Sequence, residues 1–330
     1  MSGWPLLLLA GVVSALMTGL VRRYALARSI LDVPNARSSH TAPTPRGGGV
    51  AIVLATLAAL PVLAAAGSLP WAALWALGGA GGFVALIGFL DDHGHIAARW
   101  RLLAHFAAAA WALAWLGGAP PLLVFGVSID LGWLGVLLAA VYLVWLLNLY
   151  NFMDGIDGIA SVEAIAVGVG GALLYALTGH PGLAMAPLAL AAAAGGIFMG
   201  DAGSGFLGIV LGVLSLHAAW QAPQLLWSWV ILLGVFVVDA TLTLLRRLLR
   251  GEKVYEAHRS HAYQHASRRY GRHLPVTLAV AAIDLFWLLP IALWVGAGGL
   301  DGLLGVTIAY LPLLALAVKY RAGMPESGPA

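Results

Sequence analysis

Apolar stretches long enough to cross a lipid bilayer follow one another along almost the whole chain. Of its 330 residues, 61% are hydrophobic and 9% are charged, whereas an ordinary soluble domain carries about 25% charged residues. A water-soluble fold must cover its exterior with polar groups, so it cannot accommodate this composition. Because a spanning helix needs roughly 20 apolar residues, the chain has room for about ten or eleven spans and for no large soluble domain.

The apolar windows predict an all-α, polytopic integral membrane bundle of about eleven transmembrane helices, with ten as the alternative count. Polar breaks place the helices at residues 4–21, 48–67, 71–90, 102–118, 133–152, 159–178, 183–199, 205–220, 224–245, 275–296 and 301–318. We expect a tight loop at 200–204, between the seventh and eighth helices. Residues 1–330 are expected to form a single transmembrane domain.

The positive charges predict which helix ends face the cytoplasm. Arg22 and Arg23 follow the first apolar segment instead of preceding it, which is the reverse of a signal peptide, so we expect a retained helix with a periplasmic N-terminus. All 17 Lys and Arg residues then fall on one side of the membrane, in loops 22–47, 91–101 and 246–274 and in the C-terminal tail. The positive-inside rule makes this side, and the C-terminus, cytoplasmic.

The composition excludes cysteine chemistry and argues against nucleic acid as a partner. The chain has no cysteine, which excludes disulfides, thiolate nucleophiles and thiolate metal sites. Its net charge of +3 comes from few charged residues, and the basic ones are confined to one side of the predicted membrane bundle. We therefore expect the lipid bilayer as a partner and no nucleic acid.

Two adjacent carboxyl groups, Asp91 and Asp92, end the third predicted helix on the cytoplasmic side. Successive helical residues diverge by about 100°, so the two groups cannot easily grip one atom together and are expected to divide their roles. Neighbouring acids raise one another's pKa, which suits a proton acceptor. This pair is the candidate catalytic centre. The alternative is an acidic helix end paired with Arg99 or Arg101.

Oxygen-bearing side chains recur every three residues at the end of the fifth predicted helix. They are Asn148, Asn151, Asp154 and Asp157. This spacing stacks them along one helix face. Amide and carboxylate oxygens suit a hard cation such as Mg²⁺, and they can also read the edge of a nucleobase. The alternative, that these residues only pack, is disfavoured because polar groups are costly at the end of a span.

A glycine-rich motif at 200–205 contains Asp201. Backbone amides at the start of the following helix form an anion-binding end, and Asp201 could hold a metal that bridges to phosphate. Phe198 could offer a stacking surface to a base. The alternatives are a plain helical hairpin and an aromatic residue that only packs.

Loop 246–274 carries His258, Arg259 and His261. It is the fifth loop on this side, after 22–47, 91–101, 153–158 and 200–204. Basic loops beside a membrane commonly meet anionic lipid headgroups, and this alternative stays open. A zinc site is disfavoured because the acids favour an oxygen-liganded cation and no His-Glu-x-x-His occurs. Histidine and arginine donors instead suit a diphosphate group. The first loop has a similar character, with His40 and Arg46 among prolines and glycines, but it could also be an ordinary connector.

These five motifs, in this order and on one face, resemble the polyprenyl-phosphate N-acetylhexosamine-1-phosphate transferase superfamily, glycosyltransferase family 4, over essentially the whole chain. Segments 32–40, 46–49 and 258–264 are most similar to O-antigen-initiating members. The resemblance implies a single catalytic domain that transfers a sugar 1-phosphate from a UDP-sugar to undecaprenyl phosphate and releases UMP. It implies Mg²⁺ as cofactor, with Mn²⁺ as an alternative, and a bacterial inner-membrane location with the site facing the cytoplasm.

The resemblance also implies roles for individual residues. Catalysis falls to Asp91 and Asp92, and magnesium contact to Asn151 and Asp201. Nucleotide contact falls to Asn148, Asp154, Asp157 and Phe198, with Phe198 stacking on uracil. Contact with the diphosphate or sugar falls to His40, Arg46, His258, Arg259 and His261. The pattern His258-Arg259-Ser260-His261 departs from the His-His-His run of the peptidoglycan branch, which argues against a MurNAc-pentapeptide donor.

The resemblance leaves the donor sugar and the oligomeric state open. Subgroup likeness favours UDP-FucNAc or UDP-QuiNAc, with UDP-GlcNAc as an alternative, and a homodimer is also compatible with the sequence. The competing classes are a transporter of an anionic or phosphorylated substrate and a structural scaffold. Transporters place ionisable groups near the bilayer midplane, whereas here the acids gather at one face. Asp284, deep in its predicted helix, is the exception.

Overall fold

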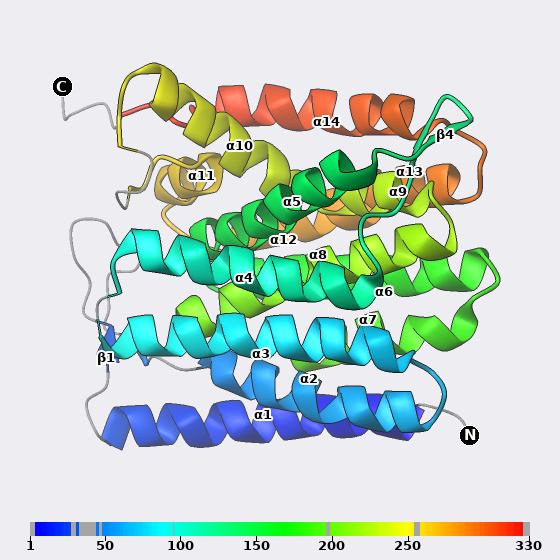
Figure 1. Cartoon of the computed structure of the whole chain (residues 1–330). Helices are drawn as coiled ribbons and strands as arrows, with labels where there is room; N and C mark the ends of the chain where they lie inside the picture. Colours follow the sequence, from blue (N-terminus) through cyan, green and yellow to red (C-terminus); the bar gives the residue numbers. More distant parts are fainter. Residues whose placement is uncertain are drawn as a thin grey trace.

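The structure is a computed structural model that describes residues 4–27, 31–32, 44–45, 48–94, 96–195, 199–253 and 258–325. Long helices lie side by side and fill most of the molecule (Figure 1). They are α1 (Trp4–Ala27), α2 (Gly48–Ala65), α3 (Trp71–His93), α4 (Ala98–Leu116), α5 (Gly132–Met153), α6 (Ile159–Leu177), α7 (Met185–Ala193), α8 (Gly200–Gln221), α9 (Leu225–Leu232), α10 (Gly234–Leu249), α11 (Ala262–Tyr270), α12 (Leu274–Ile283), α13 (Leu289–Gly296) and α14 (Gly302–Lys319). A 3₁₀ turn, Pro181–Ala184, precedes α7, and a π-helical turn, Asp284–Leu288, joins α12 to α13.

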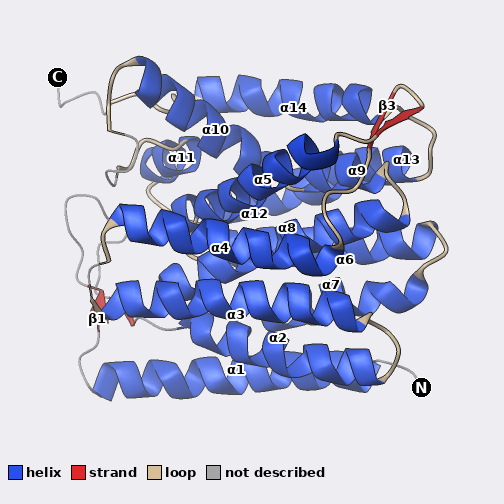
Figure 2. Cartoon of the chain, in the orientation of Figure 1, coloured by secondary structure: helices blue, strands red, loops and turns tan. Residues whose placement is uncertain are grey.

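The described strands form two small antiparallel pairs at opposite ends of the helices (Figure 2). Strand β1 (Leu31–Asp32) pairs with β2 (Thr44–Pro45), and β3 (Leu122–Val124) pairs with β4 (Val127–Ile129). The second pair is a hairpin between α4 and α5, with Phe125 and Gly126 at its tip in positive-φ conformations. The side chains of β3 are partly buried and those of β4 are exposed, so this hairpin lies outside the helical core.

Six helices of the described chain are long and apolar enough to cross a membrane, or seven if the bent pair α9–α10 is one span. The six are α3, α5, α6, α8, the continuous stretch 274–296 and α14. Shorter apolar helices lie in α1, in α2 and at Pro181–Ala193. The prediction of an all-α membrane bundle is therefore confirmed. The count of eleven spans and the orientation in the membrane stay predictions.

Some helix boundaries differ from the predicted ones, because hydropathy carries no information about local backbone geometry. Residues 200–204, predicted as a loop, form the first turn of α8. The ninth predicted helix is broken into α9 and α10, which are bent by 71°. Helix α11 was not predicted, because it is short, polar and amphipathic: Tyr263 and Ala266 are buried, while Arg268 and Arg269 extend the opposite face.

Helix α8 lies at the centre of the bundle. It is apolar on all sides, and its most hydrophobic 18-residue stretch is 100% buried inside the protein. A helix that is hydrophobic all round belongs in a core. Its glycines allow α5 to approach closely: a Cβ atom at Gly208 would lie 2.5 Å from the Cα of Leu147. Small residues at such contacts are typical of membrane bundles.

The two ends of the bundle differ in charge. One end, at the left of Figure 1, gathers the last turns of α3, α5, α10 and α14 and the first turns of α4, α6 and α8. The described basic side chains at this end are Arg23, Arg99, Arg101, Arg246, Arg247, Arg250, Lys253, Arg259, Arg268, Arg269, Arg272, Lys319 and Arg321. We call this end the basic face. The β3–β4 hairpin lies at the other end.

Candidate active site

The acid pair at the end of α3 reaches two different neighbours. The Oδ1 atom of Asp91 accepts a hydrogen bond from the Ile96 amide at 2.8 Å, and its Oδ2 atom forms an ion pair with Arg101 in the first turn of α4. The same Arg101 Nη1 atom lies 3.6 Å from Oδ2 of Asp201. The pairing with Arg101, weighed above as an alternative, is therefore what the structure shows for Asp91. Arg101 also links the ends of α3 and α8.

Asp92 instead faces the start of α8. A Cβ atom built on Gly200 would lie 3.1 Å from Oδ2 of Asp92, so this carboxylate rests directly beside the Gly200 backbone. Gly200 has φ +66°, a conformation that favours glycine. A side chain at position 200 would be strained and would also press on Asp92. As expected of successive helical residues, the two side chains point in different directions. Asp91 faces α4, and Asp92 faces α8.

Close approach of α3 and α8 depends on Gly88. A Cβ atom there would lie 2.7 Å from backbone atoms of Asp201 and Ala202, whereas a Cβ at Gly82 on the same helix would make an ordinary 3.7 Å contact with Leu57. Real Cβ atoms do not approach backbone to 2.7 Å, so α3 would have to move away from α8. That movement would separate the Asp91–Asp92 pair from Asp201.

We therefore expect Gly88→Ala to lower the unfolding temperature and the enzymatic rate, while Gly82→Ala leaves both nearly unchanged. Overpacking of this kind costs about 1–3 kcal/mol. Thermal unfolding of both variants in detergent, together with their specific activities, checks the expectation. Equal behaviour of the two variants would show that the α3–α8 contact does not shape the site.

The end of α5 brings its polar residues against the start of α8. The Asn151 amide nitrogen donates to Oγ of Ser204 at 3.3 Å, and this hydroxyl donates to the Gly200 carbonyl at 3.1 Å. Since the amide nitrogen of Asn151 is engaged, its carbonyl oxygen is the end that can reach an ion. Asn148, one turn earlier, donates to the Val144 carbonyl at 2.7 Å.

Asp154 caps the end of α5 and marks a concentration of negative charge. Its pKa lies well above the ordinary value, first because burial disfavours the charged carboxylate and then because Asp201 repels it. A hydrogen bond from the Met199 amide opposes this shift, and the charges of Asp157 and Asp92 add to it. Acids at the end of α3, at the start of α8 and in the turn after α5 thus act on the Asp154 carboxyl group.

Asp157 lies on the outer side of the same turn. Its side chain is 55% exposed, and its Oδ2 atom lies 2.9 Å from Nδ1 of His273 before α12. The Thr277 hydroxyl donates to the Asp157 carbonyl at 2.9 Å. The turn after α5 is therefore fastened to α12, with the Asp157 carboxylate at the surface.

A small cavity of about 40 Å³ lies between these helix ends. Its polar lining comes from Asp91, Arg101, His105, Asn148, Asn151 and Asp201. The volume is sufficient for a few waters or one ion with part of its hydration shell. A nucleotide is much larger than this volume.

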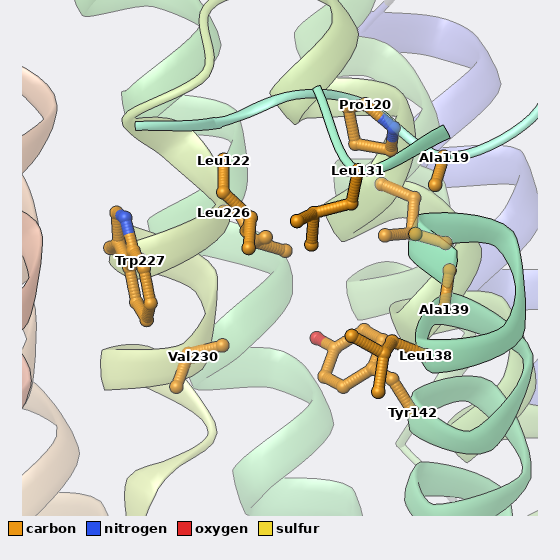
Figure 3. Close-up of a pocket in the computed structure, with 12 residues that line it drawn as sticks. Ala119, Pro120, Leu122, Leu131, Leu138, Ala139, Tyr142, Leu226, Trp227 and Val230 are labelled. Atoms are coloured by element: carbon orange, nitrogen blue, oxygen red, sulfur yellow. The ribbon is translucent and has the colours of Figure 1, made fainter. Parts of the chain in front are cut away.

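A second, apolar pocket of about 210 Å³ lies at the opposite end of α5 (Figure 3). Leu122 and Leu131, from the segments around the hairpin, lie above Tyr142, and Trp227 of α9 forms the facing wall. The Tyr142 hydroxyl is hydrogen-bonded to Ser215 at 2.9 Å. No ionisable acid or base other than this tyrosine lines the pocket, so it is not a candidate for the chemistry.

The donor set at the basic face fits a magnesium ion. Among the described residues no group of three or more His, Asp or Glu side chains forms a ready metal cage. Asp201 and the Asn151 carbonyl oxygen nevertheless border the same cavity, and oxygen ligands with retained waters are what Mg²⁺ prefers. Neighbouring acids repel the Asp154 carboxylate, and a divalent cation bound at this site would relieve that repulsion.

Helix α11 closes the site from the side of α5. Asp239 of α10 accepts hydrogen bonds from the amides of Ala262 and Tyr263, at 2.8 and 3.0 Å, and so caps the N-terminus of α11. The Tyr263 hydroxyl donates to the Phe152 carbonyl at 3.0 Å. A Cβ atom at Gly155 would lie 2.2 Å from that hydroxyl, so glycine is required for α11 to dock here.

His258 and His261 stack with ring centroids 4.9 Å apart, but they have different environments. His261 is 1% exposed; its ring stacks against the rings of Phe152 and Tyr263, and Nδ1 is 3.4 Å from Oδ1 of Asp239. Direct contact between the His261 ring and a substrate, as the resemblance implied, is not available in this structure. The reason is that His261 occupies the N-cap position of α11, which is packed against α5 and α10.

His258 is more accessible, and its proton uptake is suppressed. Its pKa is lowered to about 3, mainly because burial disfavours the imidazolium and further because His261 and Arg247 contribute positive charge, against opposing effects of Glu252 and Asp239. His258 is therefore neutral at physiological pH. It can offer one N–H donor, but positive charge must come from arginines such as Arg259.

This shift predicts acid sensitivity. The unfolded chain binds a proton on His258 near pH 6.5 whereas the folded protein does not, so the stabilisation is complete above pH 6.5 and is lost progressively as the pH falls toward 3. We expect the unfolding temperature to fall between pH 7 and pH 5, and to fall less in His258→Gln. Unfolding curves of both proteins across this range provide the check; parallel curves would contradict the assignment.

Several candidate residues lie outside the described part of the chain, namely Phe198, His40 and Arg46. Conversely, the structure adds three side-chain contacts that the sequence did not predict: His105 in the cavity, Ser204 beside Asn151, and His273 beside Asp157. The spacing of Arg101 and His105, one turn apart on α4, was an available signal for a polar face directed at Asp91. The other two contacts join segments distant in sequence and carried no local signal.

The sequence model of glycosyl transferase family 4 matches residues 73–219, from α3 to α8, which include Asp91, Asp92, Asp154, Asp157 and Asp201. A Bacillus subtilis (strain 168) protein named as a probable undecaprenyl-phosphate N-acetylglucosaminyl 1-phosphate transferase is 28% identical over 273 residues, covering 75% of this chain and 72% of that protein.

A second relative comes from Mycolicibacterium smegmatis (strain ATCC 700084 / mc(2)155). It is named decaprenyl-phosphate N-acetylglucosaminephosphotransferase and is 27% identical over 313 residues, covering 79% of this chain and 76% of that protein. Together with the helical bundle, these matches make the chain a multi-pass membrane enzyme of the transferase class. The prediction of an enzyme, in place of a transporter or a scaffold, is confirmed.

Proposed function

We propose that this enzyme transfers an N-acetylhexosamine 1-phosphate from a UDP-sugar to a polyprenyl phosphate, undecaprenyl phosphate in bacteria, and releases UMP. The observation that carries the proposal is the convergence of Asp91, Asn151 and Asp201 on one polar cavity at the basic membrane face. We place this end of the helices at the membrane surface, where a soluble nucleotide and a lipid phosphate can meet. The relatives' named activities are of this kind.

The proposed reaction joins two phosphates. An oxygen of the lipid phosphate attacks the sugar-bearing phosphorus of the UDP-sugar, the bond from that phosphorus to the bridging oxygen breaks, and UMP leaves. Asp201 and the Asn151 carbonyl oxygen would hold Mg²⁺, which supplies neutralisation of the diphosphate charge. Asp154 and Asp157, with Asn148 beside them, would face the nucleotide over the turn after α5.

The two acids of α3 are assigned separate roles. Asp91 is engaged by Arg101 and the Ile96 amide, so we assign it to positioning the ends of α3 and α4. Asp92, beside the start of α8, is assigned to the lipid phosphate, whose proton it accepts or whose approach it directs. A lipid phosphate near pH 7 is mostly ionised already, which favours the directing role.

On the opposite side of the site, the fifth loop would hold the leaving group. Arg259 provides positive charge, and the neutral His258 provides a hydrogen-bond donor for a phosphate oxygen. The buried His261 would support His258 by stacking. The sequence likeness of Phe198, His40 and Arg46 to family motifs extends the proposal to uracil stacking and phosphate contact.

Location, donor and pathway belong to the same proposal. We place the basic face in the cytoplasm of the bacterial inner membrane, following the positive charges. Both relatives carry N-acetylglucosamine in their names, so UDP-GlcNAc is the first donor to test. UDP-FucNAc and UDP-QuiNAc follow from the likeness to O-antigen-initiating enzymes. A role in starting O-antigen or another envelope glycan rests on that same likeness.

The proposal is tested by incubating purified protein with undecaprenyl phosphate, Mg²⁺ and a panel of UDP-N-acetylsugars. UMP is expected to appear only when both lipid phosphate and Mg²⁺ are present, together with a lipid of the mass of undecaprenyl diphospho-sugar. UMP release without lipid phosphate would indicate a nucleotide hydrolase. Absence of UMP with every donor, from protein that unfolds cooperatively, would refute the proposal.

A pair of buried carboxyl groups lies within the bundle and does not line the polar cavity. Glu163 of α6 is 0% exposed and Asp284, at the π turn after α12, is 2% exposed, and the two carboxyl groups interact within the bundle. Intramembrane acids often mark ion pathways. We expect Glu163→Gln to keep the transfer rate within about threefold of wild type, because neither Glu163 nor Asp284 lines the polar cavity of the proposed site. Loss of transfer in this variant, with an unchanged unfolding temperature, would tie the buried pair to function.

A further inference from the structure

The chain after α14 turns back across the basic face and packs against it. Residues 321–324, which we call the strap, begin with Arg321 at φ +58° and include Ala322, which is 0% exposed. The Gly323 amide donates a hydrogen bond to the Ser260 carbonyl at 2.7 Å. A buried alanine and a hydrogen bond to a loop more than sixty positions earlier are not expected of an exposed tail. The strap is therefore a packed part of the basic face.

Two arginines of α10 hold the strap from one side. Arg246 Nη1 donates to the Ala322 carbonyl at 2.8 Å, and Arg250 Nη2 donates to the Gly323 carbonyl. Arg250 is itself fixed by Glu252, whose Oε1 atom lies 2.7 Å from Nη2. On the other side, Nε2 of His265 on α11 is 3.3 Å from the Met324 carbonyl. The strap therefore bridges α10 and α11.

The contact with Ser260 connects the strap to the proposed phosphate-binding loop. The Ser260 hydroxyl is hydrogen-bonded to Nδ1 of His258 at 2.9 Å, and the His258 ring stacks on His261. Only Ser260 separates the Gly323 amide from the His258 ring. Arg259 lies between His258 and Ser260 in sequence, so a shift of the Ser260 carbonyl would move both residues assigned to the leaving group.

We propose that the strap is a positioning element for the UDP-sugar, and that Gly323 is its positioning residue. By fixing the Ser260 carbonyl, Gly323 orients His258 and Arg259 toward the diphosphate before the substrate binds. The inference rests on the proposed function. It extends the site to a segment that lies outside the matched family region 73–219 and that carries none of the motifs selected from the sequence.

Glycine is required at position 323 for two physical reasons. Its φ of +72° is a conformation that other L-residues rarely adopt. A Cβ atom there would also lie 2.8 Å from the Thr243 carbonyl oxygen and 2.9 Å from Cβ of Arg246. Both contacts are with the packed body of α10, which cannot yield as the tip of a flexible side chain can. Even alanine should lift the strap from α10 and from Ser260.

The test compares Gly323→Ala with Gly298→Ala. Gly298 has a similar φ of +75° and nothing within 4 Å of its Cβ position, so the control carries the same backbone strain without the collision. We expect Gly323→Ala to raise the KM for the UDP-sugar about tenfold with kcat nearly unchanged, as for loss of a contact made equally in ground and transition states. Gly298→Ala should leave both parameters unchanged.

Hydrogen–deuterium exchange provides a readout that does not depend on catalysis. In Gly323→Ala the amides of residues 258–265 should exchange about tenfold faster than in wild type, whereas those of α8 should not change. Arg246→Met, which removes one α10 anchor and leaves Gly323 intact, should move KM and exchange in the same direction. This variant keeps the test informative if Gly323→Ala does not fold.

The outcomes separate this inference from the proposed function. Faster exchange at 258–265 with an unchanged donor KM would overturn the positioning role and leave the strap a structural clamp. A fall in kcat at constant KM would overturn it as well. If wild-type protein transfers no sugar phosphate from any donor, the proposed function fails, whatever the exchange data show. Unchanged exchange in both variants would show that the strap does not hold the loop.

Discussion

Replacing Asp92 with asparagine is expected to lower the transfer rate at least a hundredfold, the order of effect seen when a positioned acid–base or charge-bearing group is removed. Asparagine keeps the shape of the side chain beside Gly200 and removes only the charge. The unfolding temperature should therefore change by only a few degrees. Initial rates of UMP release by purified variants measure the effect.

Asp91 and Asp130 provide the comparisons for Asp92. Because Asp91 is engaged by Arg101 and the Ile96 amide, Asp91→Asn should cost both stability and rate. Asp130 lies at the opposite end of α5, where its Oδ1 atom accepts from the Gly132 amide, and Asp130→Asn should be nearly neutral. If Asp92→Asn retained wild-type rates while Asp91→Asn was inactive, the division of roles would have to be reversed.

Asp201→Asn is expected to lower the rate by about 10²–10³, comparable to the loss of one preorganised electrostatic contact. Asp201 borders the same cavity as Asn151 and lies 3.6 Å from Arg101. If its role is to hold the cation, the variant should need a much higher Mg²⁺ concentration for half-maximal rate. Titrating Mg²⁺ in wild type and variant measures this directly.

A control variant separates cation binding from the ion pair. Arg101→Met removes the shared partner of Asp91 and Asp201 but keeps both carboxylates. It should lower stability and rate, while the Mg²⁺ requirement stays closer to that of wild type. A normal Mg²⁺ titration in Asp201→Asn, with a rate equal to that of Arg101→Met, would reduce Asp201 to a structural partner of the arginine.

Much of the fold was predictable because a bilayer makes hydropathy decisive. Every predicted helix has a counterpart among the described elements, since apolar length alone requires one. Hydropathy windows do not predict where the chain departs from a straight helix. The 71° bend between α9 and α10 and the π turn at Asp284 depend on tertiary packing. Helix α11 has too little apolar character to register as a span.

The site was predictable to the level of motifs but not of contacts. The acids of α3, α5 and α8 were expected at one face, and the structure brings Asp91, Asn151 and Asp201 together there. Their partners come from distant segments, as Asp157 shows with His273. The burial of His261 was also invisible, because its N-cap position depends on Asp239 of another helix. In the sequence, the strap is marked only by one glycine, Gly323.

The central claim is that a sugar phosphate, and not a sugar, moves to the lipid. It is tested most directly with UDP-N-acetylglucosamine carrying ³²P in the sugar-bearing phosphate, incubated with the enzyme, Mg²⁺ and undecaprenyl phosphate. We expect this label to enter the lipid phase, while ³²P placed in the uridine-bearing phosphate stays in water-soluble UMP. Label from the sugar-bearing phosphate recovered as soluble UDP, with the sugar on the lipid, would contradict it.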